Sequence, residues 1–178
     1  MIHDAVAWVF SFLCHQDPVR CWAPGGVPLA ICQRCTGVYA GAALMLLLLP
    51  LMRFRPTKRL TALHAVFVLQ MVVFGFHLVP HPATGRTLSG QLFIIGVLYF
   101  LWGSLRHRRA WLQGDVQPRK YLAGVVALLL LLQIAVRAPL ALAGAALDLL
   151  ALCGVAVIAG AAMLTLGDLA TRAIKQGG

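Results

Sequence analysis

Five long apolar segments constrain the fold of this chain more than any other feature of its sequence. Each is close to the roughly 20 residues that an α-helix needs to cross a bilayer. They predict an all-α fold, a polytopic transmembrane helix bundle with about five spanning helices and a single membrane domain over residues 1–178. The segments cover residues 29–52, 60–78, 87–105, 121–136 and 140–170.

The composition agrees with a membrane protein and argues against a nucleic-acid partner. Hydrophobic residues make up 61% of the chain and charged residues only 11%, which excludes an ordinary soluble domain. The net charge of +10 comes from short basic clusters between apolar segments. Such clusters are typical of loops that set membrane topology, so no nucleic acid is expected as a ligand.

The basic clusters also predict an orientation. Eleven of the fifteen Lys and Arg residues lie in the loops at 53–59 and 106–120 and in the C-terminal tail. The positive-inside rule places these segments in the cytoplasm. We therefore expect a multi-pass protein of the cell (inner) membrane, with a cytoplasmic C-terminus and the remaining loops on the outer face.

The N-terminal part is too short and too interrupted to form a spanning helix. Residues 1–13 are mostly apolar and include three aromatic side chains, which predicts a short interfacial or re-entrant helix. Residues 14–28 contain three prolines and a Gly-Gly pair, so they are expected to form a loop rich in cysteine. Under the predicted orientation, this loop lies on the outer face.

Four of the five cysteines lie in or next to this loop, and they predict a metal site. Thiolate and imidazole are the ligands that zinc prefers, and a structural zinc site needs four of them. A C-x-x-C pair at the start of a helix lets both sulfurs reach one ion. The predicted ligands of zinc, or of another thiophilic metal, are Cys14, His15, Cys32 and Cys35, with Cys21 as a substitute for His15.

Two other functions use the same thiols. A C-x-x-C pair at a helix N-terminus beside Arg34 favours thiolate, and Cys14 with Cys21 would form a second pair. That arrangement indicates a thiol-disulfide oxidoreductase that passes electrons to a quinone. In the third alternative, the chain is a small transporter or an accessory subunit whose cysteines only brace a loop. Whether the chain is an enzyme stays open at this point.

Arginine and histidine side chains of the outer loops predict an anion pocket next to the cysteines. Arginine binds phosphate and carboxylate in a bidentate manner, so the expected partners are membrane lipid and an anionic lipid or small-anion ligand. Several cations in one pocket repel each other and need an anion, or a carboxylate such as Asp17 or Asp148, to offset them. The predicted pocket residues are Arg20, Arg34, Arg86, His77 and His81.

The motifs CHQDPVR, CQRCTGVYAG and GRTLSG resemble an uncharacterised prokaryotic family of integral membrane proteins. In that family the first motif usually ends in Ser, where this chain has Cys21, and the third has Thr at the position of Ser89. The departure at Cys21 favours a metal set of three motif cysteines over a Cys14–Cys21 pair. Residues on the family pattern are Cys14, His15, Gln16, Pro18, Arg20, Cys32, Arg34, Cys35, Gly37, Tyr39, Gly41, Arg86 and Gly90.

Overall fold

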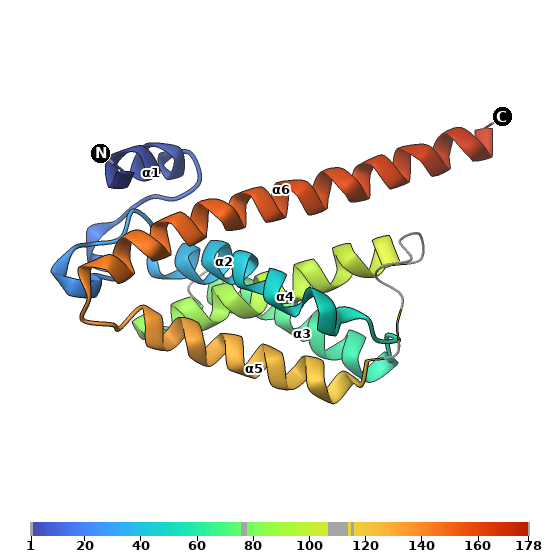
Figure 1. Cartoon of the computed structure of the whole chain (residues 1–178), viewed down its shortest axis with the longest axis horizontal. Helices are drawn as coiled ribbons and strands as arrows, with labels where there is room; N and C mark the ends of the chain where they lie inside the picture. The colour runs from blue at the N-terminus through green and yellow to red at the C-terminus, as the bar shows by residue number, and fades with distance from the viewer. Residues whose placement is uncertain (1, 76–77, 107–113, 115, 178) are drawn as a thin grey trace.

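A computed structural model describes residues 2–75, 78–106, 114 and 116–177, and they fold into a bundle of helices (Figure 1). Three short 3-10 helices accompany the α-helices: η1 (Pro18–Arg20), η2 (Pro24–Gly26) and η3 (Met45–Met52). The α-helices are α1 (Ile2–Ser11), α2 (Gln33–Leu44), α3 (Lys58–Gly75), α4 (Ala83–Arg106), α5 (Pro118–Ala135) and α6 (Ala141–Gly177). The predicted all-helical bundle is thus confirmed.

Four helices among the described residues are long and apolar enough to cross a membrane. They cover Gln33–Met52, Lys58–Gly75, Pro118–Ala135 and Leu142–Thr171. The remaining predicted span, 87–105, corresponds to α4, whose 24 residues extend over about 36 Å. The predicted number of five spans stays a prediction.

The first long helix differs from the predicted range of 29–52. Residues Leu29–Ile31 are buried but not helical, and Cys32 is the extended N-cap residue, so α2 begins only at Gln33. After Leu44 the chain continues as the 3-10 helix η3, which contains Pro50. Proline has no backbone N–H to donate, and this weakens regular α-helical bonding in the segment.

Helix α2 lies at the centre of the bundle, between α4 and α6 (Figure 1). Glycines allow this close approach, because a Cβ atom at Gly37 would collide with the Thr87 carbonyl of α4. In the same way, a Cβ atom at Gly90 would collide with the Arg34 carbonyl of α2. Helices that approach this closely in a membrane depend on small residues at the crossing.

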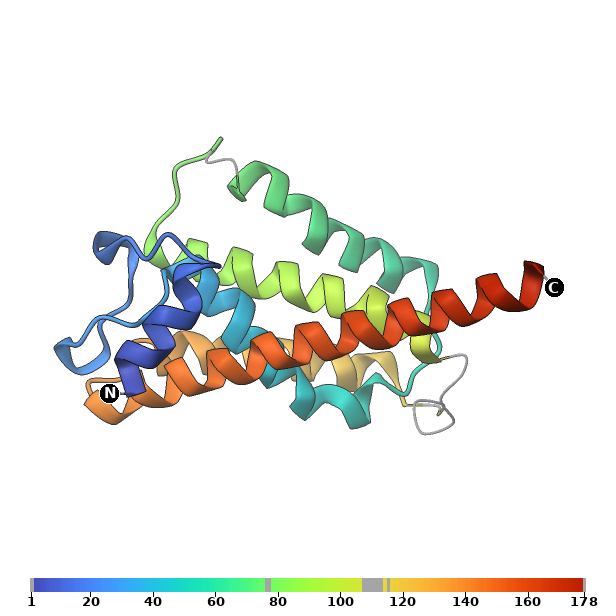
Figure 2. The ribbon, with the colours of Figure 1, turned by 90° about the horizontal axis from the view of Figure 1, so that it is seen from above.

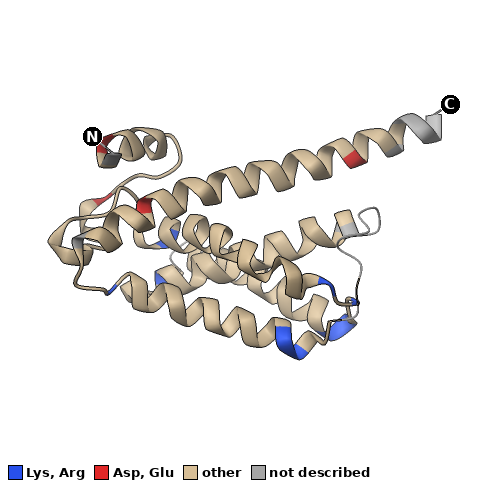
Figure 3. Ribbon diagram, viewed as in Figure 1, with Lys and Arg blue, Asp and Glu red and all other residues tan. Residues whose placement is uncertain are grey.

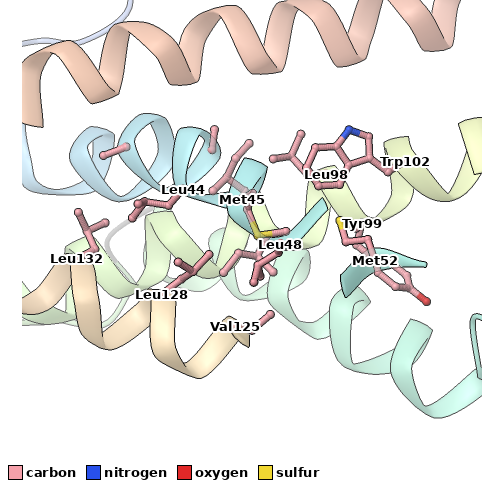
Figure 4. Packing of buried hydrophobic residues seen from close by; sticks show 14 of the residues in the cluster. Leu44, Met45, Leu48, Met52, Leu98, Tyr99, Trp102, Val125, Leu128 and Leu132 are labelled. Atoms are coloured by element: carbon pink, nitrogen blue, oxygen red, sulfur yellow. The ribbon is translucent and has the colours of Figure 1, made fainter. Parts of the chain in front are cut away.

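The apolar core fills the space between α2, η3, α4 and α5 (Figure 4). Burial of these side chains, together with the close crossings, fixes how the helices lie relative to one another. Helix α6 is the longest element, and its C-terminal part extends beyond the rest of the bundle (Figure 2). Central core residues are Leu44, Met45, Leu48, Met52, Leu98, Tyr99, Trp102, Val125, Leu128 and Leu132.

Segments that are distant in sequence meet at one end of the bundle, which we call the cysteine end. The Trp22 indole donates a hydrogen bond to Thr87 Oγ1 at 2.8 Å, which joins the N-terminal loop to α4. Arg137, between α5 and α6, lies 5.4 Å over the Trp22 ring and donates to Thr84 Oγ1. Lys and Arg residues of 53–59 and 119–120 lie at the opposite end, the basic end (Figure 3).

Helix α1 is one-sided and packs at the cysteine end. Val6 and Phe10 are buried against residues of α2 and α6, and the Phe10 ring contacts that of Tyr39. Trp8 and Phe12 point outward, with 68% and 74% of their surface exposed. This exposed aromatic pair is what an interfacial helix requires, although its placement in a membrane stays a prediction.

Candidate metal centre

Three cysteines come together at the cysteine end. The sulfur atoms of Cys14, Cys32 and Cys35 all lie within 4.8 Å of one another. Cys14 follows the turn at the end of α1. Cys32 is the N-cap residue of α2, and Cys35 lies in the first turn of that helix. The predicted proximity of these three thiols is confirmed.

The turn that carries Cys14 is fixed by the residues around it. The Cys14 N–H donates to the Phe10 carbonyl at 2.8 Å, which continues the hydrogen bonding of α1. Gln16 has a φ angle of 53°, in the left-handed region, and its side-chain amide donates to the carbonyls of Ala7 and Ala30 at 2.6 and 2.9 Å. Gln16 therefore ties the turn both to α1 and to the segment before α2.

Hydrogen bonds concentrate negative charge on Cys14. Its sulfur accepts the backbone N–H groups of Gln16 at 3.5 Å and of Cys32 at 3.4 Å. Hydrogen bonding from the thiols of Cys32 and then Cys35 lowers the pKa of Cys14. The same bond to Cys14 raises the pKa of Cys32. The Cys14 sulfur thus accepts several hydrogen bonds, and this surrounding favours its thiolate form.

Neither predicted fourth ligand joins the three sulfurs, among the residues that the structure describes. His15 follows Cys14 directly, and its exposed side chain borders a neighbouring cavity instead. The Cys21 thiol donates to the Asp17 carbonyl at 3.2 Å. Burial, followed by the electrostatic effects of Cys32 and Cys14, raises the pKa of Cys21 to about 11. Cys21 is therefore a poor thiolate in this state.

A cavity of about 190 Å³ adjoins the cysteine cluster. Two of the clustered cysteines and all three predicted arginines border it, together with the glutamine of the C-Q-R-C motif. Polar and charged residues thus line the cavity, and more of them are cationic than anionic. Its lining residues are His15, Asp17, Arg20, Cys32, Gln33, Arg34, Cys35 and Arg86.

The three arginines are held in different ways. Arg20 Nε pairs with Asp17 Oδ2 at 3.2 Å, and Arg86 donates from Nη1 to Gln33 Oε1 at 3.3 Å. Arg34 donates from its terminal nitrogens to the carbonyls of Phe74 and Gly75 and so caps the end of α3. A cation at a helix C-terminus interacts favourably with the exposed carbonyls, so Arg34 has a structural role as well.

Two arginine nitrogens have unused hydrogen-bonding capacity. The Nε atoms of Arg34 and Arg86 are buried and have no hydrogen-bond partner within the described part of the chain. Buried donors are nearly always paired in folded proteins, so unpaired donors beside a cavity indicate that a ligand or water supplies the acceptor.

Of the two predicted histidines of the pocket, the structure describes His81, which is not among the residues that line the cavity. His81 Nδ1 lies 2.8 Å from the Val79 carbonyl, and its Nε2 lies 3.4 Å from Arg34 Nη2. His81 therefore contacts the cavity only through Arg34. His77 lies outside the described residues.

Asp148 was expected to offset one of the arginines, and the structure pairs it differently. Its carboxylate lies 3.1 Å from His3 Nδ1 and accepts the Ala30 N–H at 3.1 Å, with 2% of the residue exposed. The reason is the position of α6, which packs beside α1 and α2. Asp148 thus anchors the N-terminal helix and the segment before Cys32.

Sequence reasoning missed the contributions of Gln16 and Gln33. Gln16 lies in the C-H-Q motif, but its partners Ala7 and Ala30 are apolar residues whose carbonyls give no signal in the sequence. Gln33 is 6% exposed and meets Arg86 from another helix. Its position inside the C-Q-R-C motif was the only available indication of a role.

Comparison with known proteins agrees with this picture. Residues 14–101 match the family described as "Predicted membrane protein (DUF2085)", and this range contains every residue that lines the cavity. A protein of the archaeon Methanothermobacter thermautotrophicus, named "Uncharacterized protein", is 31% identical over 67 residues. That match covers 38% of this chain and 60% of the relative. No solved structure matches the chain. The resemblance to an uncharacterised membrane-protein family is confirmed.

Proposed function

We propose that this chain, which matches predicted membrane proteins across its cysteine end, holds zinc or another thiophilic metal with Cys14, Cys32 and Cys35. The observation that carries the proposal is the spacing of their sulfurs, all within 4.8 Å of one another. A tetrahedral zinc ion with bonds of about 2.3 Å separates its sulfur ligands by about 3.8 Å. Small side-chain adjustments therefore suffice to bring the three sulfurs onto one ion.

The surroundings of the cluster support thiolate ligands. Two backbone N–H groups already donate to the Cys14 sulfur. Three thiolates and one divalent ion carry a net charge of −1, and Arg34 and Arg86 beside the cavity offset that charge. Hydrogen-bond donors around metal ligands orient them and tune the site.

The fourth coordination position faces the cavity under this proposal. Structural zinc sites have four protein ligands, whereas sites with three protein ligands keep one position for water or substrate. Cys32 and Cys35 border the cavity, as do Arg34 and Arg86 with their unpaired Nε atoms. These features support binding of an anion at the metal, either a small anion or the phosphate of a lipid head group, with His15 beside it.

The proposed orientation places this site on the outer face of the inner membrane and the C-terminus in the cytoplasm. It is supported by the concentration of basic residues at the opposite end of the bundle (Figure 3). A cysteine introduced at Val19, which is 87% exposed, tests it in a Cys153→Ser background. A membrane-impermeant maleimide should label Val19→Cys in intact cells. Labelling only after the cells are opened would show that the orientation is the opposite of the proposed one.

Metal content of the purified protein tests the central proposal. Mass spectrometry should find close to one metal ion per chain in the wild type and a large loss in Cys14→Ser, Cys32→Ser and Cys35→Ser. Cys153→Ser is the matched control, because Cys153 is exposed on α6, far along the chain from the cluster. Cys21→Ser should also keep the metal. A metal-free wild type, or full metal content in Cys32→Ser, would refute the site.

The oxidoreductase alternative has one observation in its favour. Cys21 and Cys32 are paired in an isolated antiparallel bridge, which brings these two cysteines next to each other. A disulfide that cycles with a quinone would use this pair. Mass analysis of unreduced protein separates the two functions, because a Cys21–Cys32 disulfide in a metal-free protein would replace the metal proposal.

A further inference from the structure

A second cavity lies at the basic end of the bundle, where no site was expected. It has a volume of about 220 Å³ and lies between the segment after η3, the start of α3 and the end of α4. Half of the lining residues are aromatic, and half of them are buried in the bundle. The central lining residues are Met52, Phe54, Thr61, Tyr99, Trp102 and Gly103.

The lining has one polar feature of note. Thr61 Oγ1 and Tyr99 Oη lie 3.1 Å apart, so one hydroxyl donates to the other. This pairing leaves one hydroxyl hydrogen to donate to a ligand oxygen. An apolar cavity with a single hydroxyl donor suits a hydrocarbon chain that carries an ester group, and it does not suit a peptide, whose backbone needs many partners.

Cationic residues flank one lining residue of this cavity in the sequence. Pro56 lines it, and Arg55 and Lys58 lie on either side of Pro56 in the sequence. Both are exposed, as are Arg53 and Arg59, and none of the four has an ion pair within the described part of the chain. Apolar walls next to unpaired cations match a molecule with an apolar tail and an anionic head group.

We propose that this cavity binds one anionic phospholipid. An acyl chain occupies the aromatic cavity, an ester oxygen accepts from the Thr61–Tyr99 pair, and the phosphate contacts Arg55 and Lys58. The depth of the Thr61–Tyr99 pair in the membrane agrees with that of a lipid ester group. Both residues lie within about two turns of the helix ends, where head groups meet hydrocarbon. Basic sites between membrane helices are known binding places for phosphorylated head groups.

Gly103 provides a direct way to close the cavity. A Cβ atom built at Gly103 has no neighbouring atom within 4 Å, so a larger side chain enters the cavity without a collision. Gly103→Leu should therefore fill the site and leave the bundle intact. Gly160→Leu on α6 is the matched control, because Gly160 also has open space around it and does not line the cavity.

Native mass spectrometry of the protein with phosphatidylglycerol or phosphatidylcholine of the same acyl chains measures the binding. The wild type should retain one phosphatidylglycerol in preference to phosphatidylcholine. Each surface cation contributes about fivefold to such binding, so Arg55→Gln with Lys58→Gln should lower the affinity about 30-fold. Arg119→Gln with Lys120→Gln removes the same charge from α5, which does not line the cavity, and should change little.

Two outcomes would overturn the proposal. Equal retention of both lipids would mean that only bulk lipid covers this surface. Unchanged phosphatidylglycerol binding in Gly103→Leu would place the lipid elsewhere. Loss of binding in Gly103→Leu with normal metal content would support the proposal, and it would do so independently of the cysteine cluster.

Discussion

The two ends of the bundle each contain a cavity of similar size, yet they distribute charge in opposite ways. At the cysteine end, arginine side chains border the cavity itself, and two of their Nε atoms are buried. At the basic end, aromatic side chains form the cavity and the cations lie exposed outside it. The first arrangement suits a small polar ligand with defined geometry, and the second suits an amphiphile.

The difference reflects what a membrane protein must do to bury a cation. A buried charge needs fixed partners, and for Arg34 and Arg86 these come from the carbonyls at the end of α3 and from Gln33. The cations of the basic end remain solvated and need no such network. More side chains are therefore held by fixed hydrogen bonds at the cysteine end than at the basic end. Mutations at the cysteine end should have the larger effects on stability and binding.

The largest effect is expected from Gly90→Val. The new side chain would collide with the Arg34 carbonyl of α2, a backbone atom beside the cysteine cluster. Overpacking of this kind costs about 3 kcal/mol or more, a large part of the stability of most proteins. The yield of monodisperse protein and its melting temperature should fall sharply. Gly160→Val, in open space, should behave like the wild type, and equal behaviour of the two variants would contradict the close crossing.

Asp148→Ala should have the next largest effect, confined to the cysteine end. It leaves the buried Ala30 N–H without an acceptor and removes the partner of His3, at a cost of about 1–3 kcal/mol. Thermal unfolding measures the loss. Asp148→Asn keeps an acceptor for Ala30 and should cost less. If Asp148→Ala also abolished phosphatidylglycerol binding at the basic end, the two ends would not be independent.

Arg86→Gln should weaken anion binding while the metal stays in place. The variant removes a cation whose Nε has no partner in the described structure, and a hydrogen bond to a charged group is worth about tenfold or more in affinity. Calorimetric titration of the metal-loaded protein with inorganic phosphate measures this affinity. Arg137→Gln is the control, since Arg137 lies at the same end and does not line the cavity. If both variants bound phosphate with equal affinity, the proposed anion pocket would be refuted.

The smallest effect is expected at Cys21, and it separates the metal proposal from the redox alternative. Because its pKa is raised to about 11, Cys21 is mostly protonated at pH 8 in the folded protein. In a Cys153→Ser background, its alkylation by iodoacetamide should stay slow up to pH 9 and accelerate towards pH 11. Fast alkylation of Cys21 at pH 8 would indicate a reactive thiolate and favour the oxidoreductase.

Patterns in the sequence predicted those features of the structure that depend on residues close together in the chain. Apolar segment lengths indicated the long helices, and the C-x-x-C spacing placed Cys32 and Cys35 on one helix start. The contact with Cys14 followed because the intervening loop had to fold back over that start. These inferences need only helix geometry and turn residues.

Contacts between distant helices could not be predicted in the same way. Nothing near Asp148 in the sequence indicates His3 as its partner, and the pairing of Gln33 with Arg86 depends on how α2 crosses α4. His64 was given no role, yet it is fully buried and lies 2.8 Å from the Tyr121 hydroxyl. The aromatic cavity was missed because three separate segments form it.

The contact between α6 and the cysteine end has a consequence for biosynthesis. The three clustered cysteines are synthesised before α6, in which Asp148 accepts the Ala30 N–H and Gly154 lies directly against the Tyr39 carbonyl. Until α6 enters the membrane, the nascent segment before Cys32 lacks one of its anchors. The segment before Cys32 therefore gains its full set of contacts only after α6 has been made, and a chain cut off before α6 should hold its cysteine cluster less firmly.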